Sequence, residues 1–134
     1  MTAADLFLIV NPIATVGWIL LLVAPRRRWA RLAAGTVIPL SLAVVYLGLL
    51  VLQWGKASGG FSTLQGVADL FENPWLLLAG WVHYLAFDLV VGTWETKDAM
   101  ERGRSRWVLA PCLVLTFLFG PVGFLAYQGA RRLG

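Results

Sequence analysis

The fold class is decided by one apolar stretch, Pro74-Trp-Leu-Leu-Leu-Ala-Gly-Trp-Val-His-Tyr-Leu-Ala-Phe-Asp-Leu-Val-Val-Gly92. Its length and hydrophobicity are those of a helix that crosses a lipid bilayer, which needs about 20 mostly apolar residues. Two ionisable side chains, His83 and Asp88, lie inside it. Because ionisable groups are costly in lipid, such residues are functional-site candidates.

The composition of the whole chain also indicates a membrane protein. Of the 134 residues, 59% are hydrophobic and 13% are charged, whereas soluble domains are about 25% charged. The single cysteine, Cys112, excludes an intramolecular disulfide and a cysteine-rich metal site. The net charge of +4 comes from arginines clustered between apolar segments, which are typical of topology signals rather than of nucleic-acid binding.

Four apolar segments are long enough to span a membrane, and none alternates as barrel strands do. We therefore predict an all-α integral membrane bundle, one domain over residues 1–134, with four transmembrane helices at about Leu6–Ala24, Leu32–Leu52, Trp75–Thr93 and Trp107–Tyr127. The third helix is expected to continue past the membrane and to stop at Gly103. In the second loop, Ser62-Thr-Leu-Gln65 resembles a capping box and predicts a short amphipathic helix on the membrane surface.

The positions of Lys and Arg predict the orientation. The first and third loops carry eight basic residues, and the other side carries only three; the eight are Arg26, Arg27, Arg28, Arg31, Lys97, Arg102, Arg104 and Arg106, and the three are Lys56, Arg131 and Arg132. The positive-inside rule then places the first and third loops in the cytoplasm and both termini outside.

His83 and Asp88 are the predicted catalytic residues. They are five positions apart, so they lie about 140° apart around a helix; they can flank one groove or face different neighbouring helices. An acid/base role suits both. The competing interpretation is that each side chain only forms a hydrogen bond that holds two helices together, with Asp88 paired to Tyr46 or Asn11. His83 can also supply the one axial ligand that a haem needs.

Several further side chains are expected to contact a ligand. On a helical wheel, Trp81, Tyr84, Gly92 and Glu95 share a broad face with Asp88. Glu95 extends that face, although its neighbourhood is also typical of a solvated helix surface. Breaks or kinks are expected at Asn11-Pro12, Pro39 and Gly120-Pro121-Val-Gly123. The predicted substrate-binding residues are Asn11, Tyr46, Trp81, Tyr84, Phe87 and Glu95.

Four short stretches carry a family resemblance: Gly59-Gly-Phe-Ser-Thr-Leu64, Leu70-Phe71, Gly80-Trp-Val-His-Tyr-Leu-Ala-Phe-Asp88 and Gly120-Pro-Val-Gly123. Over about residues 5–132 the chain is similar to the neoxanthin-synthase-type family, named in plants for abscisic-acid deficiency, and it looks like a bacterial member. The resemblance implies a carotenoid or related polyene as substrate and His83 with Asp88 as an acid/base pair. The implied chemistry is isomerisation of an epoxy-carotenoid to an allene, or oxidative cleavage to retinal-like products.

The sequence leaves two other functions open. One is a carotenoid- or haem-binding membrane protein without enzymatic activity, and the other is a small transporter or proton conductor. No cofactor is identified beyond haem or iron at His83. The expected partners are a polyene and the lipid bilayer of the bacterial inner membrane, not nucleic acid, and a homo-oligomer is compatible with the chain.

Overall fold

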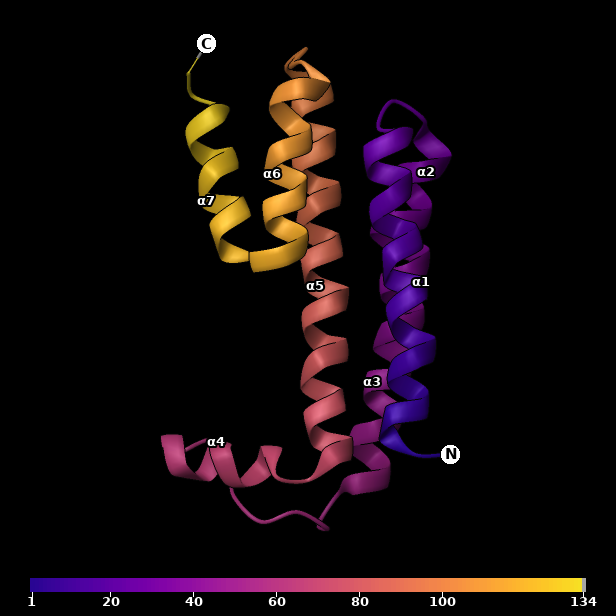
Figure 1. The fold of residues 1–134 in the computed structure, drawn as a ribbon, viewed down its shortest axis with the longest axis vertical. Coiled ribbons are helices and arrows are strands. Elements are labelled where there is room, and N and C mark those ends of the chain that lie inside the picture. Colours follow the sequence, from indigo (N-terminus) through magenta and orange to yellow (C-terminus); the bar gives the residue numbers. More distant parts are fainter. Residues whose placement is uncertain (134) are drawn as a thin grey trace.

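The computed structural model describes residues 1–133, and these form an all-α fold (Figure 1). The elements are α1 (Ala3–Val23), α2 (Arg28–Leu32), the π-helical segment η1 (Ala33–Val37), α3 (Ile38–Gln53), α4 (Leu64–Phe71), α5 (Pro74–Glu101), α6 (Arg106–Phe119) and α7 (Pro121–Ala130).

Three helices are long and apolar enough to cross a membrane. They are α1, the continuous segment Arg28–Gln53, and α5, which correspond to the first three predicted spans. The helix α5 runs on to Glu101, and the chain turns at Gly103 with a positive φ of 64°, as the sequence predicts. The chain is therefore a helical membrane-type protein.

The short helix of the second loop is present, but its cap differs from the prediction. Thr63, not Ser62, is the N-cap, and its hydroxyl accepts a hydrogen bond from the Gly66 N–H at 3.0 Å. The helix α4 has no buried residue and projects sideways from the end of the long helices (Figure 1). This position suits an amphipathic helix lying on a membrane surface.

The prolines of the first two spans disturb the helices less than predicted. The helix α1 continues through Pro12, and the Thr15 hydroxyl donates to the Asn11 carbonyl at 2.9 Å. Ahead of Pro39 the chain forms the π-helical turn η1, a local widening that accommodates an irregular position without ending the helix.

The predicted fourth span, Trp107–Tyr127, is not confirmed. The structure divides these residues into α6 and α7, which fold back on each other as a helical hairpin (Figure 1). Gly120 makes the turn with φ 30°, a conformation that residues with a Cβ rarely adopt. Pro121 then opens α7 at a position where its missing N–H costs nothing.

The hairpin changes the predicted topology. The C-terminus lies at the end of the molecule that holds the α1–α2 and α5–α6 turns, and the N-terminus lies at the opposite end (Figure 1). Arg131 and Arg132 thus join the eight other basic residues, so ten of the eleven lie at one end and Lys56 lies at the other. Because one end now carries nearly all the positive charge, the fold obeys the positive-inside rule better than four spans do.

Small residues allow α5 to pack closely on its neighbours. A Cβ added to Gly92 would meet the Trp18 ring, and one added to Gly17 would meet the Leu89 side chain. Close approach at glycine is the usual way in which membrane helices gain van der Waals contact. The helices α1 and α3 pack on α5, and α4 and the hairpin also pack on it; α6 in addition touches α1, where the Trp18 ring lies 5.6 Å from that of Phe117.

Candidate functional site

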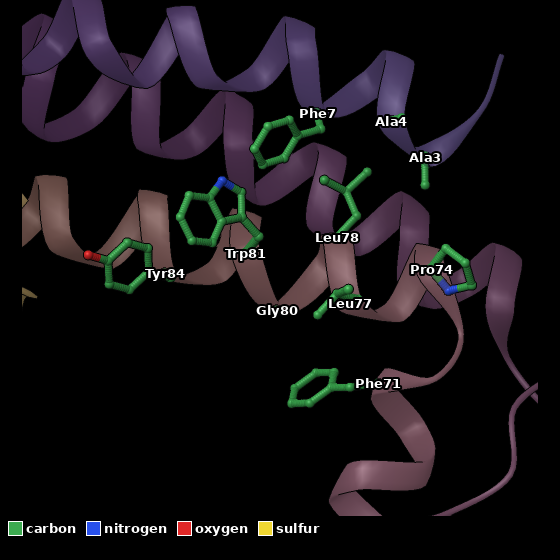
Figure 2. A pocket seen from close by; sticks show the side chains of 10 residues that line it. All are labelled: Ala3, Ala4, Phe7, Phe71, Pro74, Leu77, Leu78, Gly80, Trp81 and Tyr84. Carbon is green, nitrogen blue, oxygen red and sulfur yellow. The ribbon is translucent and has the colours of Figure 1, made fainter. Parts of the chain in front are cut away.

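Two grooves flank the N-terminal half of α5. The Tyr84 groove, of about 680 Å³, is almost wholly apolar and is lined by Ala3, Ala4, Phe7, Phe71, Pro74, Leu77, Leu78, Gly80, Trp81 and Tyr84 (Figure 2). The His83 groove, of about 440 Å³, is lined by Tyr46, Leu50, Gln53, Trp54, Gly55, Ala57, Phe61, Leu70, Phe71, Leu76, Ala79, Gly80 and His83. An apolar concavity with a few polar groups is typical of a small-molecule site.

Asp88 lies one helical turn beyond Tyr84, against the tip of the hairpin. A Cβ added to Gly120 would be 2.8 Å from Asp88 Oδ1 and 2.9 Å from Oδ2, so a side chain at position 120 would displace the carboxyl group. Asp88 Oδ2 is buried and has no hydrogen-bond partner among residues 1–133. An unpaired buried oxygen is costly, which makes this carboxyl group the strongest candidate for chemistry.

Tyr84 fastens the hairpin tip beside this carboxyl group. Its hydroxyl lies 3.2 Å from the carbonyl oxygens of Phe117 and Leu118 and can donate to either. These carbonyls belong to the last turn of α6, where helical partners are lacking. The phenol therefore satisfies a helix end and fixes one wall of the groove.

Asn11 and Trp81 form a second polar contact at the groove. The Trp81 indole Nε1–H donates to Asn11 Oδ1 at 2.8 Å, and the Trp81 ring lies 5.3 Å from that of Tyr84 and 5.8 Å from that of Phe7. Asn11 thus positions an aromatic wall residue. The hypothesis that Asn11 pairs with Asp88 is wrong.

The structure does not bring His83 and Asp88 together. The His83 ring lies 5.6 Å from Tyr46 and 4.9 Å from Phe87, on the side of α5 that faces α3, and it lines the His83 groove. Tyr46 accordingly meets His83 rather than Asp88. His83 lines the His83 groove, whereas Asp88 lines neither groove, so an acid/base pair acting within one groove does not form in this conformation.

Glu95 is buried in the hairpin interface, so the expectation of a solvated surface is wrong for this residue. It is 0% exposed, and the Thr116 hydroxyl lies 3.0 Å from both of its carboxyl oxygens. Glu95 lines neither groove. Its visible contact is with α6, which makes it a docking contact for the hairpin.

Asp98 holds the other end of the hairpin. Its carboxylate accepts hydrogen bonds from the Tyr127 hydroxyl at 2.7 Å, from Arg131 Nη2 at 2.8 Å and from Arg102 Nε at 2.9 Å. The Arg131 guanidinium also lies 5.3 Å from the centre of the Trp94 ring. Three donors from two helices therefore converge on one carboxylate at the basic end of the molecule.

We expect Asp98→Asn to destabilise the docked hairpin by about 1–2 kcal/mol, because charge-assisted hydrogen bonds are lost at a partly exposed site. The measurement is the denaturation midpoint in detergent micelles. Glu101→Gln is the matched control, since Glu101 makes only an exposed 4.0 Å pair with Lys97. Equal midpoints for the two variants would contradict the role of Asp98.

The described part of the chain offers few side chains that could bind a metal ion. Within residues 1–133 no group of three or more His, Cys, Asp or Glu side chains is arranged to hold a metal ion. Haem ligation by His83 needs only one such side chain, and it stays a prediction.

The sequence did not single out Thr116 as a residue that shapes the site, and it marked Gly120 and Gly123 only as positions of irregular backbone. Thr116 contacts Glu95, while Gly120 and Gly123 allow the hairpin to turn and to close. The Gly-Pro-x-Gly pattern was a signal for irregular backbone. It gave no indication that the chain reverses there.

A model of the family described as ABA DEFICIENT 4-like matches residues 5–127. This match includes most of α1, all elements from α2 to α6, most of α7, and every residue that lines either groove except Ala3 and Ala4. Neither a curated protein nor a solved structure matches the chain in the corresponding comparisons.

Proposed function

Because the chain belongs to the ABA DEFICIENT 4-like family, we propose that it is a membrane enzyme that transforms a carotenoid or related polyene. The family is linked to carotenoid-related membrane proteins of the neoxanthin type. We place the protein in the bacterial inner membrane with its basic end in the cytoplasm, because ten of its eleven Lys and Arg residues lie at that end.

One observation carries the proposal: an apolar groove is lined at one end by Tyr84, and a carboxyl group with an unpaired oxygen, that of Asp88, lies one helical turn beyond this residue. The Tyr84 groove is lined by aromatic and aliphatic side chains, which suit an apolar polyene. Asp88 lies one turn further along α5 with Oδ2 free of partners in the described chain. A ligand lying in the groove would bring its end group toward this carboxyl group.

The reaction that this geometry supports best is an acid-catalysed isomerisation. In its protonated form the Asp88 carboxyl group gives its proton to an epoxide oxygen of the substrate, and the carbon–oxygen bond breaks. A proton then leaves the adjacent polyene carbon, which yields an allene and a hydroxyl group without adding or removing atoms. The carboxylate formed in the first step is the base that receives this second proton, and Tyr84 keeps the hairpin tip in place.

A non-enzymatic carotenoid binder is the second candidate. It is favoured by the nearly complete absence of polar groups in the Tyr84 groove, which provides affinity for a polyene without further chemistry. In that case Asp88 serves to dock the hairpin. The two functions differ in whether the bound pigment is changed.

We expect the purified protein, reconstituted in liposomes with an epoxy-carotenoid, to yield an allenic product detectable by chromatography and mass spectrometry. Asp88→Asn removes the proton donor and should lower the rate at least 100-fold, within the range typical of a lost general acid. Asp69→Asn, the same change on the surface helix α4, should leave the rate unchanged. A pigment that binds but stays unaltered would favour the binder, and an Asp88→Asn variant with more than half the wild-type rate would exclude Asp88 as the acid.

A further inference from the structure

The His83 groove is a separate pocket on the far side of the contact between α4 and α5. Phe71 and Gly80 line both grooves, and a Cβ added to Gly80 would lie 3.0 Å from Phe71 Cε1 (Figure 2). The phenyl ring is therefore close enough to the glycine to divide one groove from the other. The proposed reaction involves the Tyr84 groove and Asp88, so it leaves the His83 groove without a function.

Contacts between segments distant in the sequence build the walls of this pocket. The walls come from the end of α3, the loop that follows it, α4 and the first half of α5. The Asn73 side-chain amide donates to Gln53 Oε1 at 3.1 Å and joins the start of α5 to the end of α3. The Gly60 N–H donates to the Gly66 carbonyl at 3.1 Å and fastens the loop to α4. Specific hydrogen bonds therefore fix the shape of the pocket.

Two polar side chains, His83 and Tyr46, lie at the inner end of the pocket. Their rings are 5.6 Å apart. His83 comes nine residues after Pro74, the first residue of α5, which corresponds to about 14 Å along the helix. Because the hydrocarbon core of a bilayer is about 30 Å thick, the imidazole lies near the middle of the membrane.

Neither of these two side chains has a hydrogen-bond partner among residues 1–133. Trp81 and Tyr84 lie at a similar depth on α5 but differ in this respect, since the indole and the phenol both have protein oxygens as acceptors. Hydrocarbon contains no water that could replace such partners, and an unpaired buried N–H or O–H group costs about 1–3 kcal/mol. An oxygen atom of a ligand in the pocket would remove this cost.

The polar groups and the walls together indicate the chemistry of the ligand. A phenol and a neutral imidazole each supply one hydrogen for donation, and a carbonyl oxygen accepts two hydrogen bonds. The outer part of the pocket is lined by the aromatic rings of Trp54, Phe61 and Phe71, which suit a flat ring. The volume of about 440 Å³ is within the range of small-molecule sites. These features match a quinone, a flat ring with carbonyl oxygens that dissolves in lipid when it carries an alkyl tail.

We propose that the His83 groove binds a membrane-soluble quinone, with one ring carbonyl accepting hydrogen bonds from Tyr46 and His83. The ring lies between aromatic side chains, and the alkyl tail extends into the surrounding lipid. This role accounts for two side chains that the proposed reaction does not use. Because the pocket contains neither Asp88 nor Tyr84, quinone binding does not depend on the proposed function.

The test measures how tightly a benzoquinone with a ten-carbon tail binds to the full-length protein in detergent micelles, from quenching of tryptophan fluorescence. Tyr46→Phe and His83→Leu should each weaken binding about five- to tenfold, as expected for one lost hydrogen bond. Tyr127→Phe is the matched control, because it removes a hydroxyl group in α7, outside the pocket, and it should change the affinity less than twofold. Wild-type affinity in both Tyr46→Phe and His83→Leu would overturn the proposal.

A second pair of variants locates the bound quinone. Trp54 lines the pocket, so Trp54→Phe should remove at least half of the quenching. Trp107→Phe, at a position that is 80% exposed and at the other end of the molecule, should leave the quenching unchanged. If the two variants are quenched equally, the quinone binds elsewhere and the assignment of the pocket is wrong.

Two competitors identify the chemistry that the pocket selects. Decylbenzene has the ring and the tail without oxygen, so it should displace the quinone only at concentrations at least tenfold higher than those of an oxygen-bearing competitor, since two hydrogen bonds are missing. Zeaxanthin, which carries hydroxylated rings on a polyene, should compete less well than a second quinone. Equally strong competition by decylbenzene would mean that hydrogen bonds do not select the ligand. Stronger competition by zeaxanthin, lost in Tyr46→Phe, would assign the pocket to a carotenoid ring instead.

Discussion

Replacing Gly123 with alanine is expected to undock the C-terminal hairpin, although alanine is the better helix former. The added Cβ would overlap the Thr116 backbone nitrogen and Cα as well as its hydroxyl oxygen. Backbone atoms cannot rotate away, so α6 and α7 must separate. We expect a loss of about 2–3 kcal/mol, as for other overpacked interfaces, which exceeds the gain of up to about 1 kcal/mol from helix propensity.

Cys112 provides the measurement, because it is the only cysteine and is buried in α6. Undocking exposes its thiol, so Gly123→Ala should accelerate alkylation by a maleimide at least tenfold. Gly129→Ala is the matched control in the same helix, since a Cβ there meets nothing within 4 Å. Alkylation of Gly123→Ala at the control rate would mean that the two helices are not packed as described.

The second prediction concerns the side of the membrane on which the C-terminus lies, and it is tested by cysteine labelling. In a Cys112→Ala background, single cysteines are placed at Glu101→Cys, Leu133→Cys and Ser58→Cys, all at exposed positions. With a membrane-impermeant maleimide, the first two should be labelled from one side of sealed vesicles and the third only from the other. The reason is that the hairpin returns the chain to the end of the molecule at which α5 finishes.

A fold with four transmembrane spans predicts that one of these cysteines is labelled from the opposite side of the vesicle. Leu133→Cys would then be labelled together with Ser58→Cys rather than with Glu101→Cys. Permeabilised vesicles, in which all three cysteines should react, control for local burial. The outcome therefore decides between three spans with a hairpin and four spans.

The three long helices could be predicted because hydropathy and length are properties of a single segment of the sequence. The hairpin could not, since residues 107–127 have the length and hydropathy of a span. What reverses the chain is a set of contacts between helices: Gly123 fits against Thr116, Gly120 fits against Asp88, and Tyr84 caps the end of α6. Such contacts are not encoded in any single segment.

In the candidate site, too, features of a single helix could be predicted and contacts between helices could not. The helical wheel correctly grouped Tyr84, Asp88 and Glu95 on one face of α5, because that grouping is a property of one helix. The partners of these residues come from other helices, such as Thr116 for Glu95 and Asn11 for Trp81. The angular separation of His83 and Asp88 was predicted, but the choice between one groove and two depended on where α3 and α4 lie.

Polar side chains on α5 also explain how a short hairpin is held in an apolar environment. Tyr84, Glu95 and Asp98 each contact α6 or α7. Lipid provides no hydrophobic force between helices, so hydrogen bonds and close packing must hold them together. Asp88 differs from these residues in that Oδ2 remains unpaired in the described chain, which is why it is the candidate for chemistry.

The limited reach of the hairpin has a further consequence. With 14 residues in α6, its rise is about 21 Å, less than the roughly 30 Å of the hydrocarbon core. The Tyr84 groove is lined by the start of α1, by Phe71 of α4 and by the first half of α5, so it lies on the N-terminal side of the hairpin tip. Under the proposed function, we therefore expect a polyene to reach this groove from the leaflet on the N-terminal side, and molecules in the other leaflet to cross the bilayer first. The supply of substrate then depends on how pigments are distributed between the leaflets as well as on their total amount.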